Sequence, residues 1–357
     1  MTRHNARKSR RSKAALDFSP PSGARKAKFP DFFQPELATL ADEAPAGNQW
    51  LHEIKFDGYR SLCRIVHGQV NFLTREGNDW TSRYGVLAGA ASELPVEEAF
   101  LDGEVVVFEE NGSTNFQSLQ DALARKETHR LAYCIFDVSY LNGYDLMPAP
   151  LISRKEILAE ILKSGGKEPP LCFSDHLIGQ GEAFYQKACQ LGLEGVISKR
   201  IDSPYRPGRG RDWLKIKCHE SQEFVIGGFT DPAGSRAGLG ALLLGFYNDN
   251  GDLVYTGRVG TGFTQESLKE LRSRLDRLAQ KSPPFSTPLT ASQRRGAHWV
   301  KPELVAEIEF TGWTRDGLLR HPSFKGLRED KPAGKVKRER KISTPAVEKK
   351  APTNARR

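Results

Sequence analysis

Short runs in which apolar and polar residues alternate recur along the chain, and they constrain its fold more than any other feature. Such runs cover residues 61–66 and 70–74, separated by a turn at His67 and Gly68, and also "DWLKIKC" at 212–218. Alternation of this kind predicts strands with one buried face, and a short turn between two of them predicts an antiparallel pair. Four stretches have the helical pattern instead: 83–91, 116–124, 153–164 and 181–192. The chain is therefore expected to be α+β, with antiparallel sheets and flanking helices.

The pattern of apolar and turn-forming residues changes after residue 220. Strand-like runs at 223–230, 241–260 and 304–313 are divided by Gly- and Asn-rich turns, and "NDNGD" at 248–252 is typical of a hairpin. One helix, at about 265–280, interrupts them. About five strands and one helix in so short a stretch favour a small closed or nearly closed β-barrel of the OB type. An SH3-like barrel fits the same pattern less well.

Charge and length divide the chain into four parts. The 357 residues are enough for two domains, predicted at 29–219 and 220–330. Residues 1–28 hold nine Lys or Arg and one Asp, and residues 331–357 hold ten Lys or Arg and two Glu. The net charge of +9 therefore comes from the two ends, since the remaining 34 basic and 41 acidic residues leave the body acidic. Both ends are expected to be disordered tails that favour a phosphate-rich partner.

Several classes of protein are excluded by what the sequence lacks. No run approaches the roughly 18 apolar residues of a membrane span, and the N-terminus has no apolar signal stretch, which predicts a cytoplasmic protein with no membrane partner. The cysteines are odd in number and form no CxxC pair, so we expect reduced thiols and no zinc site. They are Cys63, Cys134, Cys172, Cys189 and Cys218.

The stretch "EIKFDGYR" at 53–60 places Lys55 between an acidic residue, an aromatic ring and an Asp-Gly turn. A nucleophilic lysine must be neutral, and from an ordinary pKa neutralisation at pH 7 costs about 4.6 kcal/mol. We expect burial and the positive charges of Lys215 and Lys217, which share one strand face, to offset this cost. Asp57 is expected to shape the turn or orient Lys55. Alone, Lys-x-Asp-Gly is also an ordinary strand-to-turn sequence.

A series of motifs follows this lysine in a fixed order. They are "KFDGYR" at 55–60, "TREG" at 74–77, "DGE" at 102–104, "FD" at 136–137, "EGVISK" at 194–199 and "KIK" at 215–217. The series resembles that of the covalent nucleotidyltransferases, which comprise ATP-dependent DNA ligases, RNA ligases and mRNA capping enzymes. The sequences of these motifs, together with the stretches "FVIGGFT", "GRVGTGF" and "HPSFKGLREDK", are most similar to those of the bacterial LigD-type ligases of end joining. The resemblance covers about residues 30–332.

The resemblance implies an ATP-dependent DNA ligase with Lys55 as the catalytic nucleophile. Lysyl-AMP would form first, AMP would pass to a DNA 5′-phosphate, and a 3′-hydroxyl would then displace it. The implied cofactors are ATP and Mg²⁺, with Mn²⁺ as an alternative metal. Glu194 and Glu104 are the implied metal ligands, although Glu104 could bind the ribose instead. The implied nucleotide-binding residues are Glu53, Arg60, Arg75, Glu104, Phe136, Lys215, Lys217, Arg328 and Lys331.

Three of the assignments have plain alternatives. Phe136 could be a core aromatic residue, and Glu53 could be a solvated strand charge. Arg328 and Lys331, with Asp330 between them, resemble the family's last motif, which closes over the triphosphate; alternatively they are a charged end before a tail.

The implied partners are double-stranded DNA with nicks or ends and a Ku-type end-binding protein, in the bacterial cytosol or nucleoid. An RNA ligase, a guanylyltransferase and a non-catalytic OB-type nucleic-acid-binding protein are the rival functions. No polymerase or phosphoesterase module is expected, because the remaining ends are short.

Overall fold

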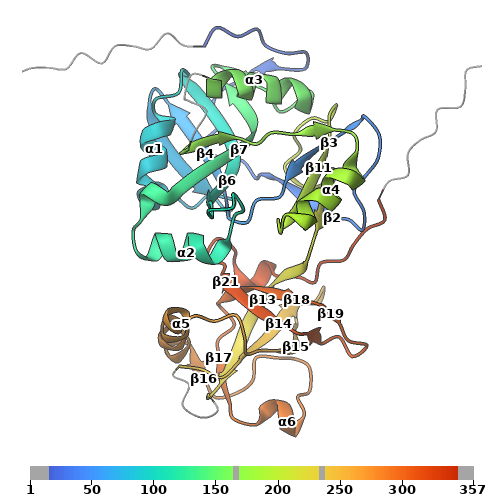
Figure 1. Ribbon diagram of the computed structural model, residues 1–357. Coiled ribbons are helices and arrows are strands. Elements are labelled where there is room, and N and C mark those ends of the chain that lie inside the picture. Colours follow the sequence, from blue (N-terminus) through green and yellow to red (C-terminus); the bar gives the residue numbers. More distant parts are fainter. Residues whose placement is uncertain (1–15, 164–168, 233–237, 345–357) are drawn as a thin grey trace, which may run out of the picture.

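The computed structural model describes residues 16–163, 169–232 and 238–344, and it forms two lobes (Figure 1). The upper lobe holds two sheets side by side, and the lower lobe holds the strands that follow residue 219. The outer parts of both predicted tails, 1–15 and 345–357, lie outside the described residues. The division at residue 219 stays a prediction, with β12 ending at Lys217 and β13 beginning at Glu220.

The first sheet of the upper lobe has the order β1-β8-β7-β6-β4-β5, with β9 also paired to β7. All pairs are antiparallel except β7–β9. Every residue of β7 is buried, because α1 and α3 pack against it and β6, β8 and β9 pair with it. The elements are β1 (Arg25–Lys26), β4 (Tyr59–Val66), β5 (Gln69–Thr74), η1 (Thr81–Arg83), α1 (Gly85–Ala91), β6 (Glu98–Val107), α2 (Phe116–Ala124), η2 (Thr128–Arg130), β7 (Leu131–Leu141), β8 (Tyr144–Asp145), α3 (Leu151–Lys163) and β9 (Leu171–Phe173).

The second sheet has the order β10-β3-β11-β12-β2 and is covered by α4. Its elements are β2 (Glu36–Leu40), β3 (Trp50–Ile54), β10 (Leu177–Ile178), α4 (Gly181–Gln190), β11 (Gly195–Arg200) and β12 (Gly208–Lys217). Ile54 pairs with Val196, and Gly195 pairs with Lys217. This register brings the end of β3, the start of β11 and the end of β12 to one edge of the sheet. The site described below begins at that edge.

The lower lobe is the predicted OB-fold domain, but its strands do not close into a barrel within the described residues. The sheet has the order β15-β14-β13-β17-β16, and β18 joins the first part of β13 and also pairs with β21. The long strand β13 thus pairs with β18 along its first part and with β14 and β17 along its later part. The sheet stays open at β15, β16 and β21. The elements are β13 (Glu220–Thr230), β14 (Leu242–Tyr247), β15 (Leu253–Val259), α5 (Gln265–Arg277), β16 (Ala279–Gln280), α6 (Ala291–Arg294), β17 (Ala297–Val300), β18 (Val305–Phe310), β19 (Gly312–Trp313), β20 (Leu319–Arg320), β21 (Ser323–Leu327) and η3 (Ala333–Lys335).

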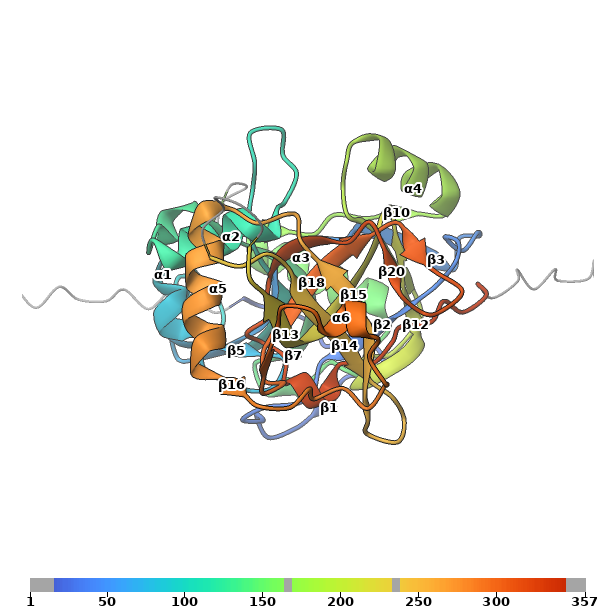
Figure 2. The same ribbon diagram turned by 90° about the horizontal axis from the view of Figure 1, so that it is seen from below.

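The two lobes contact one another beside α5. Seen from below, α5 stands on the same side as α2 (Figure 2), and Arg125, at the end of α2, pairs with Glu266 of α5 at 2.9 Å. A second ion pair joins Arg83 to Glu329 at 3.0 Å. The lower lobe therefore lies closed against the upper one.

Three expectations need correction. Both tails predicted to be disordered are packed in part. In the first, Leu16 and Phe18 pack against the core and β1 pairs with β8. The second, from residue 331, is packed as far as Thr344, because Val336 is fully buried and Ile342 forms a bridge with Ala41. The cysteines are not all free thiols, since Cys189 and Cys218 approach to a Cα–Cα distance of 5.3 Å and form a disulfide. The predicted helix at 83–91 is shorter: a 3₁₀ turn ends at Arg83, and α1 starts at Gly85. The helix at 116–124 is confirmed. No helix within the described ranges is long and apolar enough to span a membrane.

Candidate active site

A cavity of about 190 Å³ lies between the two sheets of the first domain and the OB domain. Both domains contribute side chains to its wall. All the site residues predicted from the sequence line it: Glu53, Lys55, Arg60, Arg75, Glu104, Phe136, Glu194, Lys215, Lys217, Arg328 and Lys331. The structure thus gathers the predicted set in one place, whereas the role of each residue stays a prediction.

Lys55 follows the last residue of β3, and its backbone N–H donates to the Gly195 carbonyl at 2.9 Å. Its Nζ forms an ion pair with Glu194 at 2.5 Å. Burial lowers the pKa of Lys55, but the carboxylates of Glu194, Asp57 and Glu104 outweigh burial and raise the pKa to about 12. The expectation that neighbouring cations would favour a neutral Lys55 is therefore wrong for this structure, because acidic groups are its close neighbours.

The turn after Lys55 requires both Asp57 and Gly58. The Asp57 carboxylate accepts from the Phe116 N–H at 3.2 Å, at the start of α2, as expected for a residue that shapes the turn. A Cβ at Gly58 would lie 2.2 Å from the Val105 carbonyl oxygen, so a side chain cannot fit there. The close approach of this turn to β6 fixes the position of Lys55 relative to Glu104.

Two carboxyl groups beside Lys55 are buried among other acids. Burial raises the pKa of Asp57 and that of Glu104 to about 7 each. For Glu194 burial acts in the same direction, but Lys55 and Lys217 outweigh it and lower the pKa. Glu194 is therefore the ionised carboxylate of the group, and its Oε2 atom is buried with no hydrogen-bond partner among the described residues.

One end of the cavity, here called the base end, is built around Glu53. Its carboxylate accepts from Lys155 at 2.6 Å, Lys199 at 2.8 Å and the Ser174 hydroxyl at 3.1 Å. The Glu53 and Lys155 side chains are 2% and 1% exposed. Burial would raise the pKa of Glu53, but the two ammonium groups lower it. The alternative that Glu53 is a solvated strand charge is thus wrong.

Phe136 and Arg60 lie beside this cluster. The Arg60 guanidinium is 4.4 Å from the centre of the Phe136 ring and donates to both Asp102 oxygens at 2.6 Å. Lys199 lies 4.3 Å from the same ring. Phe136 lines the cavity but is only 7% exposed, so it belongs to the core and to the cavity wall together.

Lys215 and Lys217 both face the cavity, as their spacing on one strand predicts. Burial lowers the pKa of Lys215 to about 8, although a 2.6 Å ion pair with Glu339 opposes that shift. Lys217 donates to the Ser221 hydroxyl and carbonyl oxygens, each at 2.9 Å.

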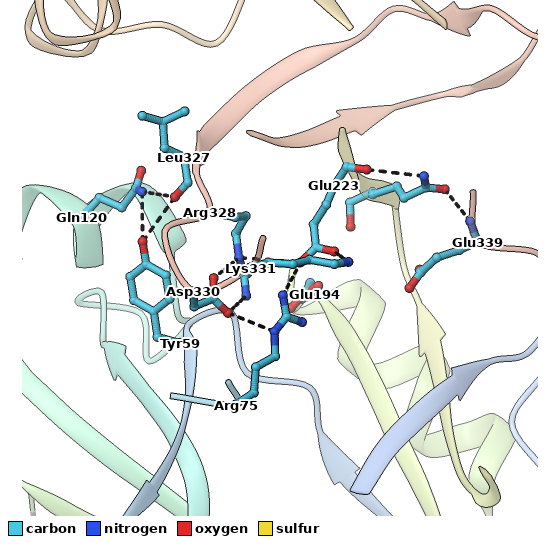
Figure 3. A network of polar contacts seen from close by, with 12 residues as sticks. Tyr59, Arg75, Gln120, Glu194, Glu223, Leu327, Arg328, Asp330, Lys331 and Glu339 are labelled. Carbon is cyan, nitrogen blue, oxygen red and sulfur yellow. Dashed lines mark hydrogen bonds and ion pairs between the residues drawn. The ribbon is translucent and has the colours of Figure 1, made fainter. Parts of the chain in front are cut away.

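The opposite end of the cavity, here called the phosphate end, is lined by cations from both domains (Figure 3). Arg328 donates to Asp330 at 2.9 and 3.0 Å. Arg75 reaches Glu223 at 3.4 Å and Asp330 at 3.6 Å, and Lys331 pairs directly with Glu223. Burial would raise the pKa of Glu223, but Lys331 and Arg75 hold it well below its usual range.

Comparisons with known proteins agree with this geometry. The family described as "ATP dependent DNA ligase domain" matches residues 35–217, and "ATP dependent DNA ligase C terminal region" matches residues 235–331. The chain belongs to the ATP-dependent DNA ligase family. The two matches together cover the two sheets of the upper lobe and most of the OB domain.

Similar proteins include two curated relatives and one solved structure. The "Multifunctional non-homologous end joining protein LigD" of Pseudomonas aeruginosa is 44% identical over 324 residues, 90% of this chain and 38% of that protein. Its namesake from Mycolicibacterium smegmatis is 38% identical over 86% of this chain and 40% of that protein. The chain thus spans about two fifths of these relatives. A "mycobacterial DNA ligase D complexed with ATP and MES" has a TM-score of 0.65 at 36% identity, covering 87% of this chain and 99% of that one.

The structure adds residues that the sequence analysis of this ligase-family chain did not assign. Lys155 lies in a helix whose sequence resembles any amphipathic helix, so no local pattern distinguishes it. Lys199 stands in a quoted motif, and its position there could have suggested a role. Glu223, Glu307 and Glu339 line the cavity from beyond the first domain, and only the folded arrangement of the chain brings them there.

The two carboxylates next to Lys55 are too few to form a complete metal-binding cage, but they suit a magnesium ion that also binds phosphate oxygens and water. Within residues 16–163, 169–232 and 238–344, no three His, Cys, Asp or Glu side chains are grouped so as to hold a metal ion. Magnesium in nucleotide enzymes often takes only one or two protein carboxylates, together with phosphate oxygens and water. The unpaired Glu194 oxygen and the nearby Glu104 fit that requirement.

Proposed function

We propose that this chain is an ATP-dependent DNA ligase that joins a 3′-hydroxyl to a 5′-phosphate through a lysyl-AMP intermediate. The observation that carries the proposal is Lys55, which lies at the centre of a cavity with carboxylates beside it and cations from two domains at one end. Reactions at phosphorus depend mainly on positioning and on neutralisation of charge, which such an arrangement can supply.

In the first step the Lys55 nitrogen forms a bond to the α-phosphorus of ATP, and the bond from that phosphorus to the β-phosphate oxygen breaks. Pyrophosphate leaves. The Lys55 ammonium group releases one proton to water before the attack and a second one as the phosphorus–nitrogen bond forms. Arg75, Arg328 and Lys331 are placed to neutralise the leaving pyrophosphate, while Lys215 and Lys217 are placed to hold the α-phosphate. Glu194, with Glu104 as a second ligand, would hold a magnesium ion, which would supply neutralisation of the phosphate charge.

The base end is proposed to select the nucleotide. The ionised Glu53 can accept a hydrogen bond from the exocyclic amine of adenine, whereas guanine presents a carbonyl oxygen at the same place. Phe136 and Arg60 would lie along the nucleoside, and Arg60 could turn to a phosphate when DNA is bound.

In the second step an oxygen of the DNA 5′-phosphate bonds to the AMP phosphorus, the phosphorus–nitrogen bond to Lys55 breaks, and the Lys55 nitrogen takes up a proton from water. In the third step the 3′-hydroxyl oxygen attacks the 5′-phosphorus of the DNA, AMP leaves and the hydroxyl proton is released. Because the OB domain closes over Lys55 in this structure, it must move aside before a DNA end can reach the lysine.

The substrate and setting are proposed from the relatives and the charge. We propose nicked or broken double-stranded DNA as the substrate, a role in bacterial end joining, and a Ku-type end-binding protein as a partner. Basic residues in 1–28 and 331–357 would add sequence-independent affinity for the DNA backbone, since the body between them is net acidic. Residues 29–219 and 220–330 remain the proposed domains.

The decisive experiment is adenylation with labelled ATP, with GTP and NAD in parallel. Protein freed of bound AMP should take up label from ATP alone in the presence of Mg²⁺, and the label should map to Lys55. Lys55→Arg should reduce labelling by at least about a thousandfold, because arginine cannot be deprotonated at working pH. Lys301→Arg, an exposed change on the OB domain, serves as the control.

Transfer of the label to a nicked duplex then tests the later steps. Nicked DNA should remove the label from the protein, and sealed DNA and free AMP should appear. Label that maps to another residue, or label taken only from GTP or NAD, would overturn the proposal.

A further inference from the structure

The residues that follow the last family motif remain packed against both domains as far as Thr344. Residues 336–344, here called the clasp, run back from the OB domain to the first domain, and Figure 1 shows this segment rising beside β2. On the OB domain, Val336 is fully buried and accepts from the Tyr247 N–H at 2.9 Å. Arg338 lies 4.0 Å from the Trp313 ring centre. The first half of the clasp is therefore fixed to the OB domain.

The second half of the clasp is fixed to the first domain. The Ile342 N–H donates to the Leu40 carbonyl at 2.9 Å, and its carbonyl accepts from the Asp42 N–H at 3.2 Å. The backbone and the hydroxyl of Thr344 both donate to the Asp42 carboxylate at 2.9 Å. Movement of the OB domain away from the first domain must break one of these two sets of contacts.

Between its two anchors the clasp places an acidic side chain in the cavity. Glu339 pairs with Lys215 at 2.6 Å, and its backbone N–H donates to the Gln222 side chain at 2.9 Å. The other carboxylate oxygen, Oε2, is buried and has no hydrogen-bond partner among the described residues. Burial would raise the pKa of Glu339, but Lys215 and Lys217 lower it to about 2, so the group is ionised.

A carboxylate held in this way competes with a phosphate for one ammonium group. Both are oxygen anions that accept charge-assisted hydrogen bonds, and Lys215 cannot pair closely with two of them at once without strong repulsion between the anions. A buried lysine ammonium group without an anion beside it would destabilise the protein. Glu339 supplies that anion when no nucleotide is bound.

We propose that the clasp closes the two domains on the nucleotide-free cavity, and that Glu339 occupies the place of a nucleotide phosphate on Lys215. This inference rests on the proposed function. ATP must expel the Glu339 carboxylate to bind productively, so the clasp weakens the apparent affinity for ATP while leaving the chemistry unchanged once ATP is bound. An anion built into the chain would also be available to pair with Lys215 again after AMP has left the protein.

The test compares Glu339→Gln with Glu309→Gln. The first change keeps the shape and removes the charge from the cavity. The second is the same chemical change at a carboxylate that is 40% exposed and pairs with Lys325, outside both the cavity and the clasp. Glu339→Gln should lower the KM for ATP in single-turnover lysyl-AMP formation about five- to tenfold, with the rate at saturating ATP unchanged. Thr344→Ala, which weakens the anchor on the first domain, should lower the KM about twofold, whereas Glu309→Gln should leave it unchanged.

A binding measurement separates failure of the clasp from failure of the proposed function. AMP alone, which carries the α-phosphate, should raise the thermal midpoint of Glu339→Gln more than that of the wild-type protein, whether or not lysyl-AMP forms. If the wild-type protein takes no label from ATP but the AMP difference is present, the proposed function fails and the competition stands. An unchanged or raised KM in folded Glu339→Gln, or equal effects of AMP on both proteins, would overturn the inference.

Discussion

The two ends of the cavity both contain buried ion pairs, but the partners come from different parts of the molecule. At the base end, Glu53, Lys155 and Lys199 all belong to the first domain. At the phosphate end, Arg75 of the first domain is balanced by Glu223 of the OB domain, and Lys215 is balanced by Glu339 of the clasp. Arg328 and Lys331 pair instead with Asp330 and Glu223, on the OB side of the cavity.

The difference shows which charges are permanent and which are exchangeable. Charges paired within one domain keep their partners when the domains separate, so the base end is preorganised for a nucleoside. Charges paired across domains lose their partners on opening, and a phosphate can take their place. The base end therefore resembles a fixed binding wall, whereas the phosphate end includes two cations, Arg75 and Lys215, whose acidic partners stand in for a phosphate group.

The largest expected effect comes from breaking the base end. Lys155→Met should lower the free energy of unfolding by about 3 kcal/mol, because Glu53 loses one of its two buried cations. Chemical denaturation measures the loss. Saturating ATP should not remove the difference from wild type, because no part of ATP carries a cation that could replace the ammonium group.

The matched control is Lys163→Met on the same helix. Its side chain is 70% exposed, so the change should cost less than about 1 kcal/mol. A loss from Lys155→Met no larger than that of the control would show that the base end is not held by its charges.

A smaller and reversible effect is expected at the phosphate end. Glu223→Gln leaves Lys331 and Arg75 with a neutral partner and should lower the free energy of unfolding by about 1–2 kcal/mol, since the Glu223 side chain retains 15% exposure. Saturating pyrophosphate should stabilise this variant more than it stabilises the wild type and so restore most of the loss.

Glu309→Gln on β18 is the control for that measurement. Its carboxylate pairs with Lys325 at 3.2 Å and is 40% exposed, so neither the change nor pyrophosphate should distinguish it from wild type. Failure of pyrophosphate to restore Glu223→Gln would mean that the phosphate end is as permanent as the base end.

Local patterns and the order of the motifs were enough to predict several elements of the upper lobe and the assigned residues that line the cavity. Short alternating strands and the helix at 116–124 follow from local patterns, and the ordered motifs place Lys55, Glu194 and Lys217 at one sheet edge. Such features are local, or they repeat an arrangement that a family shares, so one sequence contains them.

Pairings between distant parts of the chain could not be predicted in this way. Glu339 lies in a segment rich in Lys and Arg, where composition indicates disorder, yet the buried Val336 and the bridge from Ile342 to Ala41 fix it in place. Likewise the acidic surroundings that raise the pKa of Lys55 depend on which carboxylates the fold brings to it, which spacing along the chain does not determine.

The smallest effect is expected from the exposed ion pairs that hold the domains together. Glu329 accepts from Arg83 of the first domain at 3.0 Å and from Arg274 of α5 at 2.6 Å, and its side chain is 29% exposed. Glu329→Gln should lower the free energy of unfolding by less than about 1 kcal/mol at low salt. In about 1 M salt, where the screening length is about 3 Å, the difference from wild type should vanish. The loss caused by Lys155→Met should persist at the same salt concentration, because the water and ions that screen Glu329 do not reach Glu53.

Glu270→Gln, which removes an ion pair to Arg274 within α5 alone, controls for the loss of charge on that helix. If salt removed the base-end effect as well, the distinction between permanent and exchangeable charges would be wrong, and both ends of the cavity would have to be treated as open to solvent.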